Sequence, residues 1–126
     1  HNIFIMCDED IIVKSYPGAI SQIITNLVMN STIHAFEPSE EGSIVIKVEL
    51  SAKRIFLTFS DNGIGIEKEN IDKIFDPFFT TKRDEGGSGL GLNMVFNVVT
   101  GKLKGKIECN SLRNIGTEFK ITFNVE

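Results

Sequence analysis

Three residues that can bind a metal or an anion recur at a helical spacing. Asn26, Asn30 and His34 lie four residues apart, so in a helix their side chains share one face. Asparagine is a poor helix former, and two of them inside a helix require a reason. One interpretation is a solvated face. The other is a row of oxygen donors, because the Asn amide oxygen is a hard ligand that suits Mg²⁺ where the ion bridges phosphates.

A carboxylate stands at the end of a strand-like run, in Asp61-Asn62-Gly63-Ile64-Gly65-Ile66. Such a carboxylate can accept a hydrogen bond from the exocyclic amine of a base, and glycines let the backbone approach the ring because they carry no Cβ. The same residues are good turn formers, and taken alone they favour a plain turn. Thr117 either hydrogen-bonds near a base beside Asp61 or is simply a strand residue.

A glycine-rich run, Gly86-Gly87-Ser88-Gly89-Leu90-Gly91-Leu92, leads directly into a predicted helix. Free N–H groups at a helix start attract anions, so the run is either a phosphate contact or a flexible loop. It matches neither GxGxxG nor GxxxxGK[ST]. In the stretch before it, Phe78 and Phe79 are interpreted as an anchor that docks a lid. Lys82 and Arg83 are either cations for a phosphate tail or solvated surface.

Hydrophobic periodicity predicts the elements that position these residues. The apolar stripe of the first helix includes Leu27 and Ser31. Strands joined by short turns are antiparallel, and the helices among them favour a two-layer α/β sandwich, in which a mixed, mostly antiparallel sheet packs against three helices. The expected helices are Pro17–Phe36, Glu67–Phe75 and Leu90–Thr100; the expected strands are Asn2–Met6, Ile11–Lys14, Ile44–Leu50, Ile55–Phe59, Lys106–Ser111 and Thr117–Val125; Asp76–Gly89 is an irregular lid.

Composition excludes several classes of function. A chain of 126 residues makes one domain, 1–126, and it reads as a fragment of a longer protein. The net charge of −4 offers no footprint for nucleic acid or for an anionic membrane surface. No apolar run is long enough to cross a bilayer. The two cysteines show no metal-ligand spacing, which fits a reducing compartment, so a cytoplasmic location is expected, in a parent protein with or without a membrane anchor.

Together and in this order, the motifs resemble the conserved boxes of sensor histidine kinases. The resemblance implies the Bergerat ATP-binding fold of the GHKL superfamily, shared with gyrase, MutL and heat-shock chaperone ATPases, and a domain that binds ATP or ADP with Mg²⁺. The N, first glycine, F, second glycine and third glycine boxes correspond to Asn26–Asn30, Asp61–Gly65, Phe75–Lys82, Gly87–Leu92 and Gly116-Thr117.

The resemblance also implies a role for individual residues. Asp61 is expected to read adenine, with Thr117 helping through water. Asn30 resembles the Mg²⁺ ligand, with Asn26 beside it at the phosphate end and His34 as a phosphate contact. Many relatives carry Lys or Arg at the position before His34, where Ile stands here, so Lys82 is expected to be the γ-phosphate cation and, with Asn30, catalytic. The other implied nucleotide contacts are Gly63, Gly65, Ile66, Phe79, Thr81, Gly87, Ser88, Gly89, Leu90, Gly91 and Leu92.

One departure bears on the reaction. In hydrolysing members of the superfamily, a Glu four residues before the magnesium Asn activates water. Here that position is Asn26, whose amide cannot take a proton at neutral pH. The expected activity is therefore transfer of the γ-phosphate to a histidine on a separate phosphoacceptor domain, with a response regulator downstream. The alternatives are an ATP hydrolase of the same fold and a degenerate module that only senses ATP.

Overall fold

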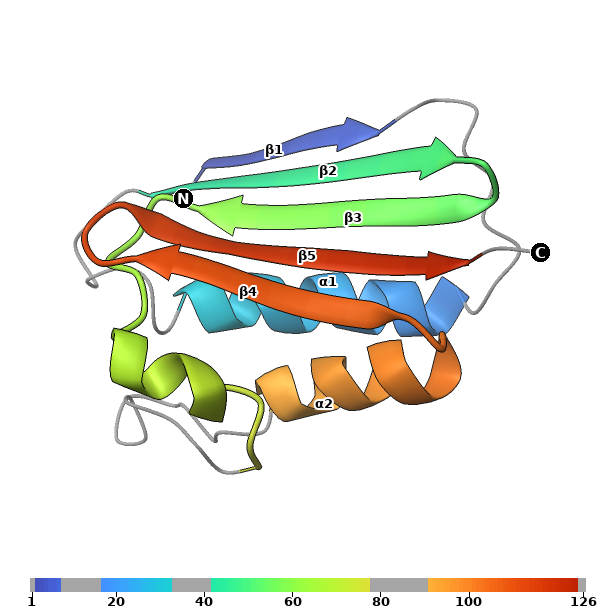
Figure 1. Cartoon of the computed structure of the whole chain (residues 1–126). Helices are drawn as coiled ribbons and strands as arrows, with labels where there is room; N and C mark the ends of the chain where they lie inside the picture. Colours follow the sequence, from blue (N-terminus) through green and yellow to red (C-terminus); the bar gives the residue numbers. More distant parts are fainter. Residues whose placement is uncertain (1, 8–16, 33–41, 78–90, 125–126) are drawn as a thin grey trace.

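The computed structural model describes residues 2–7, 17–32, 42–77 and 91–124 (Figure 1). Its strands and helices match most of the expected elements. The expected strand at 11–14 and the end of the expected first helix lie outside the described residues. The elements are β1 (Asn2–Cys7), α1 (Pro17–Asn30), β2 (Ser43–Ser51), β3 (Arg54–Asp61), the 3₁₀ helix η2 (Lys68–Lys73), α2 (Gly91–Asn97), the π-helical turn η4 (Val98–Lys102), β4 (Lys106–Leu112) and β5 (Gly116–Asn124).

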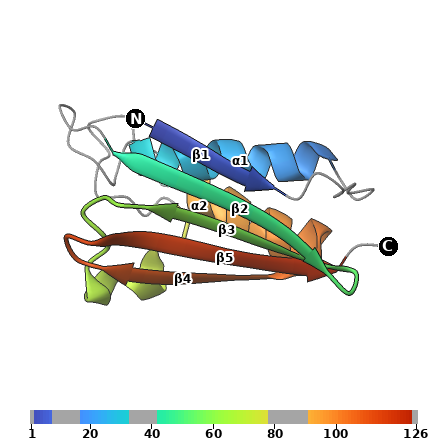
Figure 2. The ribbon, with the colours of Figure 1, turned by 90° about the horizontal axis from the view of Figure 1, so that it is seen from above.

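The five strands form one mixed sheet in the order β1-β2-β3-β5-β4. Only β1 is parallel to its neighbour, β2, and the other pairs are antiparallel. Helices α1 and α2 lie along the same face of this sheet (Figures 1 and 2). The two-layer α/β sandwich expected from the sequence is therefore confirmed.

The alternation of side chains along the strands decides which residues face the helices. In β3 and β5 every second residue is buried, and a polar residue closes the buried series of β3, Asp61, and opens that of β5, Thr117. Because successive side chains of a strand point to opposite faces, these two polar side chains share the face of the core phenylalanines Phe59 and Phe119. The sheet thus carries its polar groups inward at one end.

The core fills the space between the sheet and the two helices. Helix α1 contributes residues four apart, Ile23 and Leu27, and the two sheet phenylalanines are fully buried. Burial of a side chain of this size stabilises the fold by about 1.5–3 kcal/mol. The remaining buried apolar residues are Ala19, Ile44, Ile46, Ile55, Leu57, Ile74, Leu92, Val95, Val98, Val99, Leu103, Ile121 and Phe123. This core fixes α1 against the sheet.

The expected helix at Glu67–Phe75 differs in the structure. It is a 3₁₀ helix from Lys68 to Lys73 with no buried residue, and it continues into turns in which the Asp76 N–H donates to the Lys73 carbonyl. A helix without a buried face gains little from tertiary packing, and short 3₁₀ segments are typical of such connections. No helix in the described parts of the chain has the length and apolar character that crossing a bilayer requires.

Candidate functional site

The Asp61 carboxylate is the buried charged group at the end of β3. Its side chain is only 8% exposed. The Gly63 N–H donates to Oδ1 at 3.0 Å, and the Ser31 hydroxyl donates to Oδ2 at 2.9 Å. Each carboxylate oxygen therefore has one donor. The first comes from the loop of residues 62–66 that follows β3, called the glycine loop below, and the second comes from Ser31, directly after α1.

Burial is the dominant influence on the ionisation of Asp61. It raises the pKa of the carboxyl above its ordinary value, while hydrogen bonds from Gly63, Ser31 and the Thr117 backbone act in the opposite direction. The neighbouring Cys109 responds to the same surroundings, because burial and then the charge of Asp61 raise the pKa of its thiol to about 12. Cys109 is thus a neutral thiol at physiological pH. For Asp61, an additional hydrogen-bond donor would stabilise the charged carboxylate and so lower the pKa that burial has raised.

A row of polar side chains crosses three strands beside this carboxylate. Asp61 in β3 is paired with Thr117 in β5, which is paired with Ser111 in β4. The Ser111 and Thr117 hydroxyl oxygens are 2.9 Å apart. Ser111 also accepts a hydrogen bond from the Ile66 N–H at 2.7 Å and donates to the Gly116 carbonyl at 3.1 Å. Ser111 thereby ties the glycine loop to the β4–β5 hairpin and holds Thr117 next to Asp61.

Two glycines allow the loop and the hairpin to approach each other. Gly65 has φ +76°, and a Cβ there would lie 2.3 Å from the Leu112 carbonyl oxygen. Gly116 has φ +148°, and a Cβ there would lie 2.1 Å from the Asp61 carbonyl oxygen. Both contacts are with backbone atoms that cannot rotate away, and both dihedrals disfavour residues with a side chain. Close backbone contact at these positions therefore requires glycine.

Further hydrogen bonds hold the glycine loop on both sides. The Asn114 N–H donates to the Ile64 carbonyl at 2.7 Å, and Arg113 pairs with Glu67 at 3.0 Å. On the β2 side, the Ser43 N–H donates to the Asn62 Oδ1 at 2.8 Å. The loop that follows Asp61 is therefore held by backbone and side-chain contacts at several points along its length.

The two asparagines of α1 lie beside its buried stripe and are themselves partly buried. The Asn26 Nδ2 is buried and has no hydrogen-bond partner among the described residues. A buried amide donor without a partner is costly, so the solvated-face interpretation does not fit Asn26. Within the described residues, no group of three or more His, Cys, Asp or Glu side chains could hold a metal.

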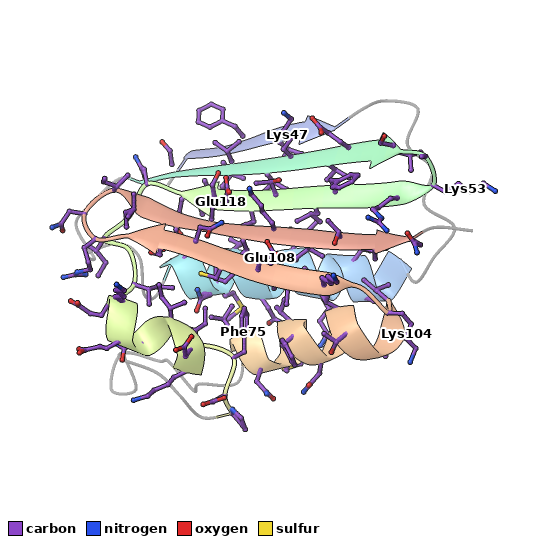
Figure 3. The ribbon with its side chains drawn as sticks, viewed as in Figure 1. Lys47, Lys53, Phe75, Lys104, Glu108 and Glu118 are labelled. Atoms are coloured by element: carbon purple, nitrogen blue, oxygen red, sulfur yellow. The ribbon has the colours of Figure 1, made fainter. Side chains whose placement is uncertain are left out.

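Phe75 is partly buried and packs against the core (Figure 3). Its ring lies 5.5 Å from that of Phe96 in the α2 helix and 6.3 Å from that of Phe119 in β5, measured between centroids. The Asn93 Nδ2 donates to the Phe75 carbonyl at 3.0 Å. These contacts hold Phe75 against α2, whose first residue Gly91 is partly exposed and whose second, Leu92, is buried.

The structure brings only part of the expected site together. Asp61 is bonded to Gly63 and paired with Thr117 across two strands, and both Thr117 and Ile66 are bonded to Ser111. Asn26 and Asn30 lie four residues apart on α1, on one side of the helix. The remaining expected lid and phosphate contacts lie outside the described residues: His34, Phe79, Thr81, Lys82, Gly87, Ser88, Gly89 and Leu90.

Comparison with known proteins identifies the family. Residues 16–126 match the family described as histidine kinase-, DNA gyrase B-, and HSP90-like ATPase. The solved catalytic domain of the histidine kinase ThkA is 31% identical and superposes with a TM-score of 0.82, covering 98% of this chain and 78% of that one. The chain belongs to the histidine kinase catalytic domains. The family resemblance drawn from the sequence motifs is confirmed.

Curated relatives of this histidine kinase domain are sensor kinases of greater length. The autoinducer 2 sensor kinase/phosphatase LuxQ of Vibrio cholerae is 36% identical over 91% of this chain and 14% of its own length. The sensor histidine kinase ZraS of Salmonella typhi is 34% identical over 86% of this chain and 22% of its own length. The chain therefore spans less than a quarter of each of these relatives.

Sequence reasoning missed two residues that contact the expected site residues, Ser31 at Asp61 and Ser111 at Thr117. Ser31 was placed in the apolar stripe of the first helix, and the structure shows it fully buried there but bonded to Asp61. A hydroxyl at a core position of a helix was the available signal, because a buried polar group needs a partner. Nothing local to Ser111 indicates its contact with Ile66, which is 45 residues away.

Proposed function

We propose that this domain binds ATP with the adenine at Asp61 and donates the γ-phosphate to a histidine on a separate phosphoacceptor domain of its parent protein. The family membership supports ATP as the ligand. The observation that carries the assignment of the base is the buried Asp61 carboxylate, which is bonded by neutral donors alone among the described residues.

The acceptor capacity of Asp61 indicates which base it selects. An ionised carboxylate has about four acceptor positions. The Gly63 N–H and the Ser31 hydroxyl each bond one oxygen, and the Thr117 backbone also favours the charged form, so the carboxylate keeps acceptor capacity for a further donor. The exocyclic amine of adenine is such a donor, whereas guanine carries a carbonyl oxygen at the same ring position and would repel the carboxylate. The arrangement therefore favours adenine over guanine.

The α1 asparagines support placing the phosphates at this helix. The Asn26 Nδ2, which has no partner among the described residues, is a donor and suits a phosphate oxygen. The Asn30 amide oxygen suits Mg²⁺, which keeps several waters and takes few protein ligands when it binds with phosphates. When bound, Mg²⁺ neutralises phosphate charge. We extend the phosphate contacts to His34, Lys82 and the glycine-rich lid, as the sequence motifs imply, with Lys82 next to the γ-phosphate.

Asn26 favours transfer of the γ-phosphate to an acceptor over hydrolysis of ATP. An amide there cannot act as the general base for an attacking water. The nucleophile is then the imidazole of the phosphoacceptor domain, and the phosphate passes onward to a response regulator. Phosphoryl transfer depends mainly on positioning and on charge stabilisation, which suits a domain that holds ATP until the acceptor docks. We place the domain on the cytoplasmic side of its parent.

A label-transfer experiment tests this function. The domain, γ-labelled ATP, Mg²⁺ and the phosphoacceptor domain of the parent protein are expected to yield acid-labile label on the acceptor. Without the acceptor, phosphate release should remain far below multiple turnover. The Asn30→Ala variant is expected to lose most of the Mg²⁺ stimulation. Sustained phosphate release without acceptor would instead indicate a hydrolase, and ATP binding without any labelled acceptor would indicate a sensing module.

A further inference from the structure

Ser31 is a fully buried hydroxyl that bridges the two layers of the domain. It follows α1 in a π-helical turn and extends the buried stripe of Ile23 and Leu27 by one more step of four residues. Its Oγ lies 2.9 Å from the Asp61 Oδ2, across 30 residues of sequence. A polar side chain that occupies a core position and contacts a buried carboxylate is not explained by packing alone.

The direction of this hydrogen bond is fixed by chemistry. An ionised carboxylate only accepts, so the single proton of Ser31 is directed at Oδ2. The Gly63 N–H is directed at the other oxygen, Oδ1. Two donors on different oxygens, one from the helical layer and one from the glycine loop, restrict rotation of the carboxylate about its terminal torsion, which is otherwise broad.

We propose that Ser31 is a positioning residue that orients Asp61 toward the exocyclic amine of adenine and thereby sets the preference for a 6-amino purine. This inference rests on the proposed adenine contact of Asp61. Because the Ser31 hydroxyl donates its proton to Oδ2, it has no proton left to donate to the base. The carboxylate itself can only accept further hydrogen bonds. A 6-oxo purine therefore finds no complementary group here.

The neighbouring residue Thr32 offers a matched control. Its hydroxyl is exposed and donates to the Val28 carbonyl at 2.9 Å, within the same helix. Replacing it removes a hydroxyl from the same π-helical turn without touching Asp61. Thr32→Ala therefore reports any general effect on this end of α1, whereas Ser31→Ala removes the contact with the carboxylate.

The test compares ATP with purine riboside 5′-triphosphate, which lacks the 6-amino group, by calorimetric titration. Wild type and Thr32→Ala are expected to prefer ATP. Ser31→Ala is expected to lose roughly five-fold in affinity for ATP, the worth of one ordinary hydrogen bond, with no change for the analogue. Ser31→Cys, a weaker donor of similar size, should show an intermediate loss and serves if the alanine variant folds poorly.

Three results would overturn parts of this account and are distinguishable. Equal binding of both nucleotides by wild type would remove the adenine contact of Asp61 and the role of Ser31 with it. A preference in wild type that persists undiminished in Ser31→Ala would overturn only the role of Ser31. An equal loss for both nucleotides would show that Ser31 supports the fold and not the recognition of the amine.

Discussion

Replacing Asp61 by asparagine is expected to weaken ATP binding by roughly ten- to a hundred-and-fifty-fold. A hydrogen bond to a charged group contributes about 1.5–3 kcal/mol, and each 1.4 kcal/mol is about a factor of ten in affinity. The asparagine keeps the shape of the side chain and one acceptor oxygen, which the Gly63 N–H can still use. Its amide group can donate to the Ser31 hydroxyl, so we expect the fold to tolerate the change and the loss to fall on nucleotide binding.

Calorimetric titration of folded protein measures this effect directly. Asp72→Asn is the matched control, because Asp72 is an exposed carboxylate on η2 and its replacement removes the same charge away from the site. We expect Asp72→Asn to bind ATP like wild type. Undiminished affinity in Asp61→Asn would contradict the adenine assignment.

Replacing Gly116 by alanine is expected to disturb the surroundings of Asp61 by displacing the backbone. The new Cβ would meet the Asp61 carbonyl oxygen at 2.1 Å, and φ at this position is +148°. The start of β5 must then move away from β3 at the pair formed by Asp61 and Thr117. Backbone strain of this kind costs about 1–3 kcal/mol, and displacing Thr117 also removes a backbone hydrogen bond that stabilises the Asp61 charge.

Two measurements on this variant separate strain from a general glycine effect. The urea midpoint of unfolding is expected to fall, and ATP affinity should drop along with it. Gly18→Ala is the control, since a Cβ at Gly18 has nothing within 4 Å and lies at the start of a helix. A Gly116→Ala variant as stable and as tight in binding as Gly18→Ala would show that the close approach of β5 to β3 has no consequence for the site.

The position of Asp61, the carboxylate proposed to bind the base, could be predicted because it follows from local pattern. The predicted strand Ile55–Phe59 stops two residues short of Asp61, but the alternation of β3 continues to Asp61 and that of β5 starts at Thr117, so both residues fall in step with the buried positions. The order of the elements predicts the two-layer sandwich, and the resemblance to histidine kinase motifs adds the Bergerat fold and the roles expected of individual residues. The pairing of β1 parallel to β2 is a tertiary contact, and no pattern within Asn2–Cys7 specifies it.

Other features could not be predicted because their causes lie far away in the sequence. The partner of Ser31 stands 30 residues away, and apolar periodicity assigned this serine to the core without indicating why it is polar. The 3₁₀ geometry of η2 was mistaken for an ordinary helix, since its lack of a buried face emerges only after packing. The requirement for glycine at 65 and 116 depends on the carbonyls of Leu112 and Asp61, which come close only in the folded chain.

The most direct test of the central claim is calorimetric titration of the purified domain with ATP and with GTP, each in the presence of Mg²⁺. A buried carboxylate that accepts from a 6-amino group predicts saturable binding of ATP and much weaker binding of GTP. Absence of ATP binding at millimolar concentration, or a preference for GTP, would contradict the account.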